Sequence, residues 1–110
     1  MAKITKRVKG DFDTILKQID GAVLSGSISA TYEDGSDYSR GDFRCAVRVY
    51  ERYSYLGKNR VSLTVVLAGT DGDYFLTVIT AGGSQAMFFK INRWGEEAFL
   101  DTIRDLIEKL

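Results

Sequence analysis

The sequence predicts one α+β domain, in which a single antiparallel twisted sheet carries two helices on the same face. Three observations lead to this fold class. The chain has 110 residues, the length of one domain covering residues 1–110. Apolar residues recur at helical spacing only near the two ends, whereas the middle alternates with the period of a strand. Turn-forming residues separate the alternating stretches, so consecutive strands should pair as neighbours.

The N-terminal part predicts a strand followed by a helix. Residues 3–9 alternate weakly and are rich in lysine, which is typical of an edge strand. Gly10 ends the strand, and Asp11 suits the N-cap of a helix. The apolar residues of this helix fall on one face: Phe12, Ile15, Leu16, Ile19 and Val23. Ser25 and Gly26 predict its end.

The middle of the chain predicts a meander of strands. A strand at 28–33 is followed by a polar loop at 34–42, and the next strand begins at residue 43. We expect that strand to turn four residues towards the core: Phe43, Cys45, Val47 and Val49. The following strand covers residues 60–67. Its core face is Val61, Leu63, Val65 and Leu67.

A hairpin and a buried strand come next. The Thr-Asp-Gly-Asp sequence at 70–73 predicts a tight hairpin, because Asp-Gly suits the twisted turns that join strands. Residues 74–81 are β-branched and aromatic, which predicts a strand buried on both faces. A turn at 82–85 then leads to a further short stretch of strand at 86–91.

The C-terminal helix carries the widest apolar stripe of the chain. Asn92 or Gly95 should open it, with Glu96 and Glu97 near its positive end. The stripe consists of Trp94, Phe99, Ile103, Leu106, Ile107 and Leu110. The predicted element order is therefore β-α-β-β-β-β-α, in which the first strand joins the sheet beside the last.

Composition excludes several classes of function. Fifteen basic and fifteen acidic residues give zero net charge, so no overall field attracts a nucleic acid. The chain has no histidine, which removes the commonest general acid–base side chain and the commonest zinc ligand. Cys45 is the only cysteine, so neither an intrachain disulfide nor a thiolate metal cluster can form. We therefore predict no cofactor and no metal, and we favour a protein that is not an enzyme.

Residues 1–7 lack the apolar run of a signal peptide. No apolar stretch approaches the about 20 residues that a membrane span needs. We therefore expect a cytoplasmic protein without a membrane partner.

Several segments carry a resemblance to a known family. They are residues 48–55, 57–63, 82–86 and 94–99. These segments are similar to a family of short bacterial proteins that is catalogued only as a domain of unknown function. The resemblance implies a bacterial, cytoplasmic protein and brings no activity. The element order also resembles the TATA-binding protein repeat and, with extra elements, the helix-grip proteins that carry small apolar ligands, although topology does not fix function.

A first candidate site is a row of arginines on one strand. Arg44, Arg48 and Arg52 share a strand face, with Tyr50 among them. Arginine pairs with phosphate and aromatic rings stack on bases, which suggests an anion or nucleic-acid surface. The alternative is a solvent-exposed face with cross-strand partners, and zero net charge favours it. We expect no nucleic-acid partner.

Two further features suggest a binding surface. Five tyrosines are candidates for an interface or a ligand rim: Tyr32, Tyr38, Tyr50, Tyr53 and Tyr55. Under the last helix, a groove near Phe89 and Phe99 is a candidate site for a small apolar ligand, although the many large side chains favour a filled core. Exposed strand edges and tyrosines also suit a homodimer.

These observations give three hypotheses. The first is a non-enzymatic binding or interaction module that acts through the sheet–helix groove or the tyrosine-rich edge. Its candidate ligand-binding residues are Arg48, Tyr50, Arg52, Phe89 and Phe99. The second is a small enzyme using carboxylate or tyrosine side chains, with no residue singled out as catalytic. The third is a nucleic-acid-associated protein that uses the face formed by Arg44, Arg48 and Arg52.

Overall fold

The computed structural model of the chain describes residues 1–27, 29–54, 59–82 and 89–110. Five strands and two helices make up this part of the chain. They are β1 (Ala2–Lys9), α1 (Phe12–Ser25), β2 (Thr31–Arg40), β3 (Phe43–Ser54), β4 (Asn59–Thr70), β5 (Asp73–Gly82) and α2 (Phe89–Lys109). The order β-α-β-β-β-β-α confirms the predicted element order.

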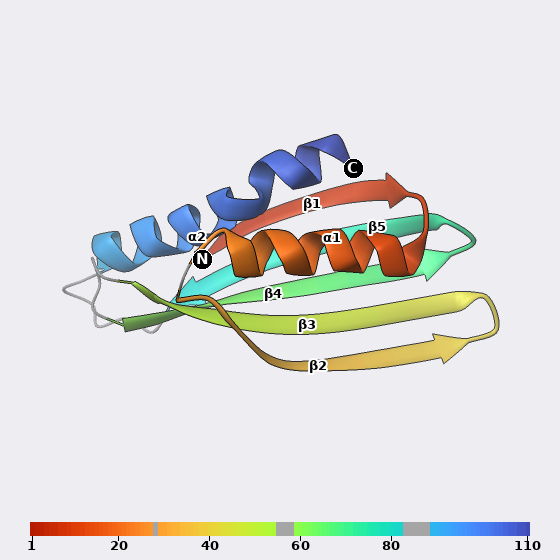
Figure 1. Cartoon of the computed structure of the whole chain (residues 1–110), viewed down its shortest axis with the longest axis horizontal. Helices are drawn as coiled ribbons and strands as arrows, with labels where there is room; N and C mark the ends of the chain where they lie inside the picture. Colours follow the sequence, from red (N-terminus) through yellow and green to blue (C-terminus); the bar gives the residue numbers. More distant parts are fainter. Residues whose placement is uncertain (28, 55–58, 83–88) are drawn as a thin grey trace.

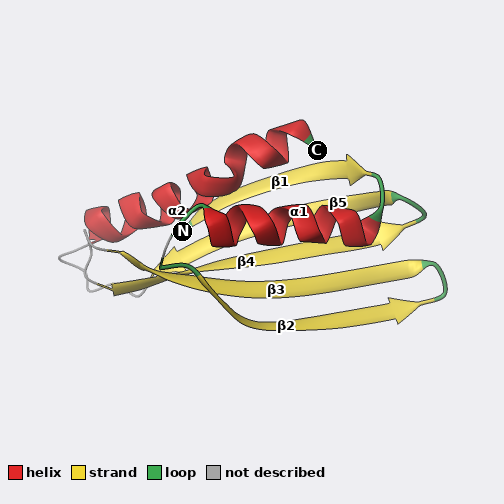
Figure 2. Ribbon diagram, in the orientation of Figure 1, coloured by secondary structure: helices red, strands yellow, loops and turns green. Residues whose placement is uncertain are grey.

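The described strands form one sheet with the order β1-β5-β4-β3-β2, and all neighbours are antiparallel. The first strand joins beside β5, the last strand of the described sheet, and the strands β2 to β5 follow one another as a meander. Both helices lie on one face of the sheet (Figures 1 and 2). The predicted α+β fold class is therefore confirmed.

The first helix begins and ends where the sequence indicates. The Asp11 carboxylate accepts a hydrogen bond from the backbone N–H of Thr14 at 2.9 Å, which caps the helix, and Gly26 follows its last turn. This bond and a second one from the Thr14 hydroxyl lower the pKa of Asp11. The buried face of the helix is Phe12, Ile15, Ile19 and Val23.

The Asp-Gly hairpin between β4 and β5 is also as predicted. Asp71 and Gly72 have φ angles of 50° and 76°, so both central residues are left-handed, and Thr70 pairs with Asp73 across the turn. Two left-handed residues in succession match the right-handed twist of the flanking strands.

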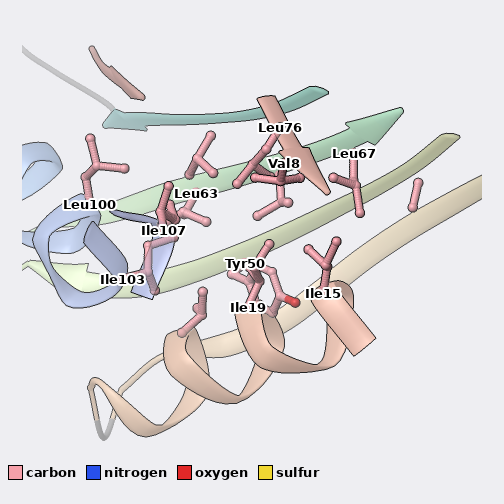
Figure 3. Packing of buried hydrophobic residues seen from close by; sticks show 14 of the residues in the cluster. Val8, Ile15, Ile19, Tyr50, Leu63, Leu67, Leu76, Leu100, Ile103 and Ile107 are labelled. Atoms are coloured by element: carbon pink, nitrogen blue, oxygen red, sulfur yellow. The ribbon is translucent and has the colours of Figure 1, made fainter. Parts of the chain in front are cut away.

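The core lies between the two helices and the sheet face that they cover (Figure 3). The predicted face of β4 is fully buried there: Val61, Leu63, Val65 and Leu67. The last helix adds Phe99, Leu100, Ile103 and Ile107. A hydrogen bond from the Thr80 hydroxyl to the carbonyl oxygen of Glu96, 3.0 Å long, ties this helix to β5.

The polar loop predicted at 34–42 is wrong. Residues 34–40 belong to β2, which pairs with β3 along its length apart from a bulge between Tyr32 and Asp34, and only Gly41 and Asp42 turn the chain. β2 is an edge strand with exposed residues on both faces, so its pairing needs backbone hydrogen bonds but few apolar side chains.

The predicted core face of β3 is also wrong. Ala46 and Tyr50, on the other face of the strand, are buried under the helices, whereas Phe43 is 37 % exposed. The register explains the inversion: Tyr50 lies opposite Leu63 and Ala46 lies opposite Leu67, so the β3 face follows the more apolar face of β4.

Two further corrections concern the C-terminal half. The strand β5 is not buried on both faces, since Phe75 is 53 % exposed. The helix α2 starts at Phe89 rather than at Asn92 or Gly95, so the strand expected at 86–91 is helical over 89–91, and its first three residues lie outside the described part.

Replacement of Ile103 by alanine tests the packing of α2 on the sheet. Because Ile103 is fully buried, the change should lower the free energy of unfolding by about 2–5 kcal/mol. Leu24→Ala is the matched control, since Leu24 is exposed, and its effect should stay within about 0.5 kcal/mol. Urea unfolding measures both, and equal losses in the two variants would contradict the assignment of the core.

The lowered pKa of Asp11 predicts an acid-dependent stability. A carboxyl group whose pKa is lower in the folded chain stabilises the fold above its unfolded pKa, and this contribution is lost as the pH falls through the folded pKa. The free energy of unfolding should therefore fall below about pH 4. The free energy of unfolding of the Asp11→Ala variant should fall less steeply in the same pH range, as measured by urea unfolding at several pH values.

Candidate functional site: a groove between α1 and the β2–β3 edge

An open groove runs between α1 and the β2–β3 side of the sheet. Its volume is about 470 Å³. Its lining residues are Asp13, Leu16, Lys17 and Asp20 from α1, with Arg48 and Tyr50 from β3. β2 continues the floor outwards, and its helix-side residues are exposed to solvent apart from the half-buried Gly35. The helices therefore leave this margin of the sheet uncovered.

Tyr50 closes the inner end of the groove. Its ring belongs to the core, and its hydroxyl donates a 2.7 Å hydrogen bond to the Asp20 carboxylate on α1. Burial and this hydrogen bond raise the pKa of Tyr50. The phenol therefore stays protonated at neutral pH, where it serves as a hydrogen-bond donor rather than as a base or nucleophile.

Arg48 provides the fixed positive charge of the groove. Its guanidinium donates two hydrogen bonds to Asp37 on β2, at 2.9 and 3.1 Å, and one to the carbonyl oxygen of Val47 at 2.9 Å. The bonds to Asp37 raise the pKa of Arg48. The Arg48 side chain is 22 % exposed and that of Asp37 is 63 % exposed, so the pair is accessible from solvent.

Tyr32 and Gly35 shape the outer floor. The Tyr32 ring meets the Tyr50 ring edge to face at a centroid distance of 5.7 Å, and Tyr32 is 49 % exposed. A Cβ atom at Gly35 would lie 2.5 Å from the Tyr32 hydroxyl oxygen and 3.0 Å from Cδ of Arg48. Only glycine at this position leaves room for both side chains.

The structure divides the predicted ligand-binding residues between two places. Arg48 and Tyr50 meet in the groove, whereas Arg52 lies over the ring of the buried Phe99 at 4.8 Å, under α2. Burial lowers the pKa of Arg52. The side chain of Phe89 lies outside the described residues.

The row of arginines faces the helices, which corrects the interpretation of a solvent-exposed face. Arg44 forms an ion pair with Asp13 of α1 at 3.0 Å and lies 4.1 Å from the centre of the Phe12 ring. Arg48 is paired with Asp37. Acidic partners therefore neutralise two of the three positive charges that a nucleic acid would need.

Sequence reasoning missed part of this groove. Tyr32 is among the candidate tyrosines, but residues 35 and 37 fall in the predicted loop, and no predicted site includes Asp13 or Asp20. The only signal in the sequence is the spacing of acidic residues along the first helix, together with basic residues on a strand. This signal indicates a groove only when it is known which strand lies beneath the helix.

The described residues offer no metal site, since no three acidic or thiol side chains converge closely enough to bind an ion. No helix in the described ranges has the length and apolar character required to cross a membrane.

Comparison with known protein families assigns the chain to one of them. A family model described as "Family of unknown function (DUF6054)" matches residues 1–110. The chain belongs to the DUF6054 family. The predicted membership in a family of unknown function is thereby confirmed. No curated protein matches the sequence of this DUF6054 chain. Its resemblance to the TATA-binding protein repeat and to helix-grip proteins stays a prediction.

A double-mutant cycle tests the hydrogen bond between the sheet and α1 in this DUF6054 protein. Tyr50→Phe should lower the free energy of unfolding by about 1–3 kcal/mol, because it removes a donor to a charged acceptor. In the Asp20→Ala background, Tyr50→Phe should lower the free energy of unfolding by clearly less. Urea unfolding of the four proteins gives the coupling energy, and strictly additive losses would show that the bond does not form in solution.

Proposed function

We propose that this protein is a non-enzymatic interaction module that binds an extended peptide segment along the edge of β2, with side chains of the segment entering the groove beside α1. The observation that carries the proposal is the position of β2: it is an edge strand directly beside an open groove. An exposed sheet edge recognises a peptide through main-chain hydrogen bonds, and an adjacent pocket adds specificity for side chains.

The two edges of the sheet differ in a way that supports this choice. The edge strand β1 carries Lys3, Lys6 and Lys9, which discourage the pairing of another strand. β2 contains no lysine, and residues 35–40 pair with β3 in uninterrupted register. The sheet therefore has one protected edge and one edge that is better suited to accept a further strand.

The chemistry of the groove indicates what the bound segment carries. Arg48 and Lys17 share the groove lining with Asp13 and Asp20, and Arg48 is already paired with Asp37, so the charges of the lining do not favour an anionic side chain. The exposed ring of Tyr32 offers contact area to an apolar or aromatic side chain next to it. A segment with an apolar or aromatic residue on the side that faces the helix layer fits this feature.

The other hypotheses have less support from the geometry. Tyr50 has a raised pKa, and its hydroxyl is engaged by Asp20, which does not suit a catalytic tyrosine. Arg44 and Arg48 already have acidic partners, which does not suit a nucleic-acid surface. Phe99 and Ile103, which would line the groove expected for a small apolar ligand, are fully buried in the described core, and this favours a packed interior there.

Selection from a display library of random extended peptides tests the proposed binding site. Enriched peptides should perturb amide NMR signals along residues 31–40 and along 13–20 of α1. Tyr32→Ala should weaken binding at least about 10-fold, the loss expected for one buried aromatic contact. Tyr38→Ala, on the same strand but on the opposite sheet face and of similar exposure, should weaken it less.

Backbone methylation of an enriched peptide distinguishes strand addition from binding by side chains alone. Methyl groups on the amides that face β2 remove the main-chain donors and should abolish binding, whereas methylation of the alternate amides should not. Failure to enrich any peptide, or NMR changes confined to other parts of the chain, would contradict the proposal.

A further inference from the structure

No described helix or strand covers the sheet face opposite the helices, and the centre of this face is apolar. Nine residues of its three central strands contain no charge: Phe75, Thr77 and Ile79 on β5, Thr64, Val66 and Ala68 on β4, and Cys45, Val47 and Val49 on β3. Phe75 is 53 % exposed, and the other eight are half-buried by their neighbours. The charged residues on this face lie mainly on the edge strands, so the patch has the apolar centre and polar rim of an interface.

The register divides this face into rows that cross all five strands. The first row, in the strand order of the sheet, is Lys3, Ile79, Thr64, Val49 and Asp34. The second is Thr5, Thr77, Val66, Val47 and Ser36. The third is Arg7, Phe75, Ala68, Cys45 and Tyr38. Each row is centred on β4. A rotation by 180° about an axis along β4 therefore exchanges β1 with β2 and β5 with β3.

We propose that a second copy of the chain packs on this open face, with a two-fold axis parallel to β4. The two sheets would form an aligned sandwich, in which Val66 lies on the axis and faces the same residue of the other copy. Both helix layers, and with them both grooves, would then lie on the outside.

The shape of the face is complementary to itself under this rotation. The exposed Phe75 of one copy comes to lie over Cys45 of the other, and both are flanked by Ala68, so a large side chain meets small ones. In the first row Ile79 comes to lie over Val49. The small residues of β4 leave space along the axis for both sheets to approach.

The charges on the edges select the same axis. The rotation brings Lys3 of each copy over Asp34 of the other, and Arg7 over the ring of Tyr38. At the opposite end Lys9 approaches Arg40, which is a like-charge contact, and the neighbouring Asp73 is already paired with Arg7. A two-fold axis across the strands would instead stack β1 on β1 and place lysines and arginine against each other.

The area of the face is sufficient for a specific dimer. These three rows and a fourth, which runs from Lys9 to Arg40, lie about 6.8 Å apart on five strands about 4.8 Å apart. They cover roughly 650 Å² per copy. The total of about 1,300 Å² lies within the range of specific interfaces.

Sedimentation of the wild-type chain and of two interface variants tests the dimer. The wild type should sediment at twice the chain mass of 12.3 kDa. Val66→Glu places two carboxylates at the axis and should give the monomer, and Phe75→Ala should raise the dimer dissociation constant at least about 10-fold. Phe75 is already largely exposed in the single chain, so this second variant keeps its fold even if the first does not. Tyr32→Glu, on the groove side, is the control and should leave the dimer intact.

Charge reversal tests the orientation of the two copies. Lys3→Glu alone and Asp34→Lys alone should each weaken the dimer, because like charges then meet twice, and the double variant should restore it. A wild type that remains monomeric up to about 200 µM, where even a micromolar dimer would form, would overturn the proposal. So would a Val66→Glu variant that still dimerises, or a double variant that is no tighter than the single ones. Peptide binding in the groove depends on Tyr32 and not on Val66, so the outcomes for the two proposed surfaces are independent.

Discussion

The pairing of β3 with β4 is the constraint on which the rest of the structure depends. Leu63 lies opposite Tyr50, and Val65 lies opposite Arg48, so the helix-facing side of β3 is set by the face of β4 that enters the core. A shift of the register by one residue would place Val47 and Val49 under the helices and remove Arg48 from the groove. The core, the groove and the open face are therefore consequences of the same set of backbone hydrogen bonds.

This pairing brings three arginines onto the covered side of the sheet, and each guanidinium group makes a different kind of contact there. Arg44 reaches Asp13 at the start of α1, and Arg48 reaches outwards to Asp37 on the edge strand. Arg52 lies over the Phe99 ring, and no carboxylate among the described residues pairs with it. Long side chains can cover apolar surface with their stems and still place their charge near the margin of the core, so a strand face rich in arginine can form part of a buried layer.

Two helices cannot cover both faces of a five-stranded sheet. The groove beside α1 and the open sheet face are the two surfaces that they leave exposed. The groove lies at the margin of the covered face, where α1 leaves β2 exposed. The apolar rows lie on the opposite face, where no helix of the described chain packs (Figures 1 and 2). Because the surfaces are separated by the thickness of the sheet, a dimer through one leaves the other accessible in both copies.

The sequence alone determined the features that depend on local patterns. Helical spacing predicted α1, Asp11 predicted its cap, the Asp-Gly turn predicted the last hairpin, and the strict alternation of β4 predicted its buried face. The tertiary structure decided the features for which local patterns conflict or are silent. Both faces of β3 can pack against a core, and only the register with β4 selects the one that carries Tyr50. An edge strand such as β2 gains its stability from backbone pairing, so its polar sequence resembles a loop. The groove combines residues from both of these elements with α1, and for this physical reason no single stretch of sequence indicated it.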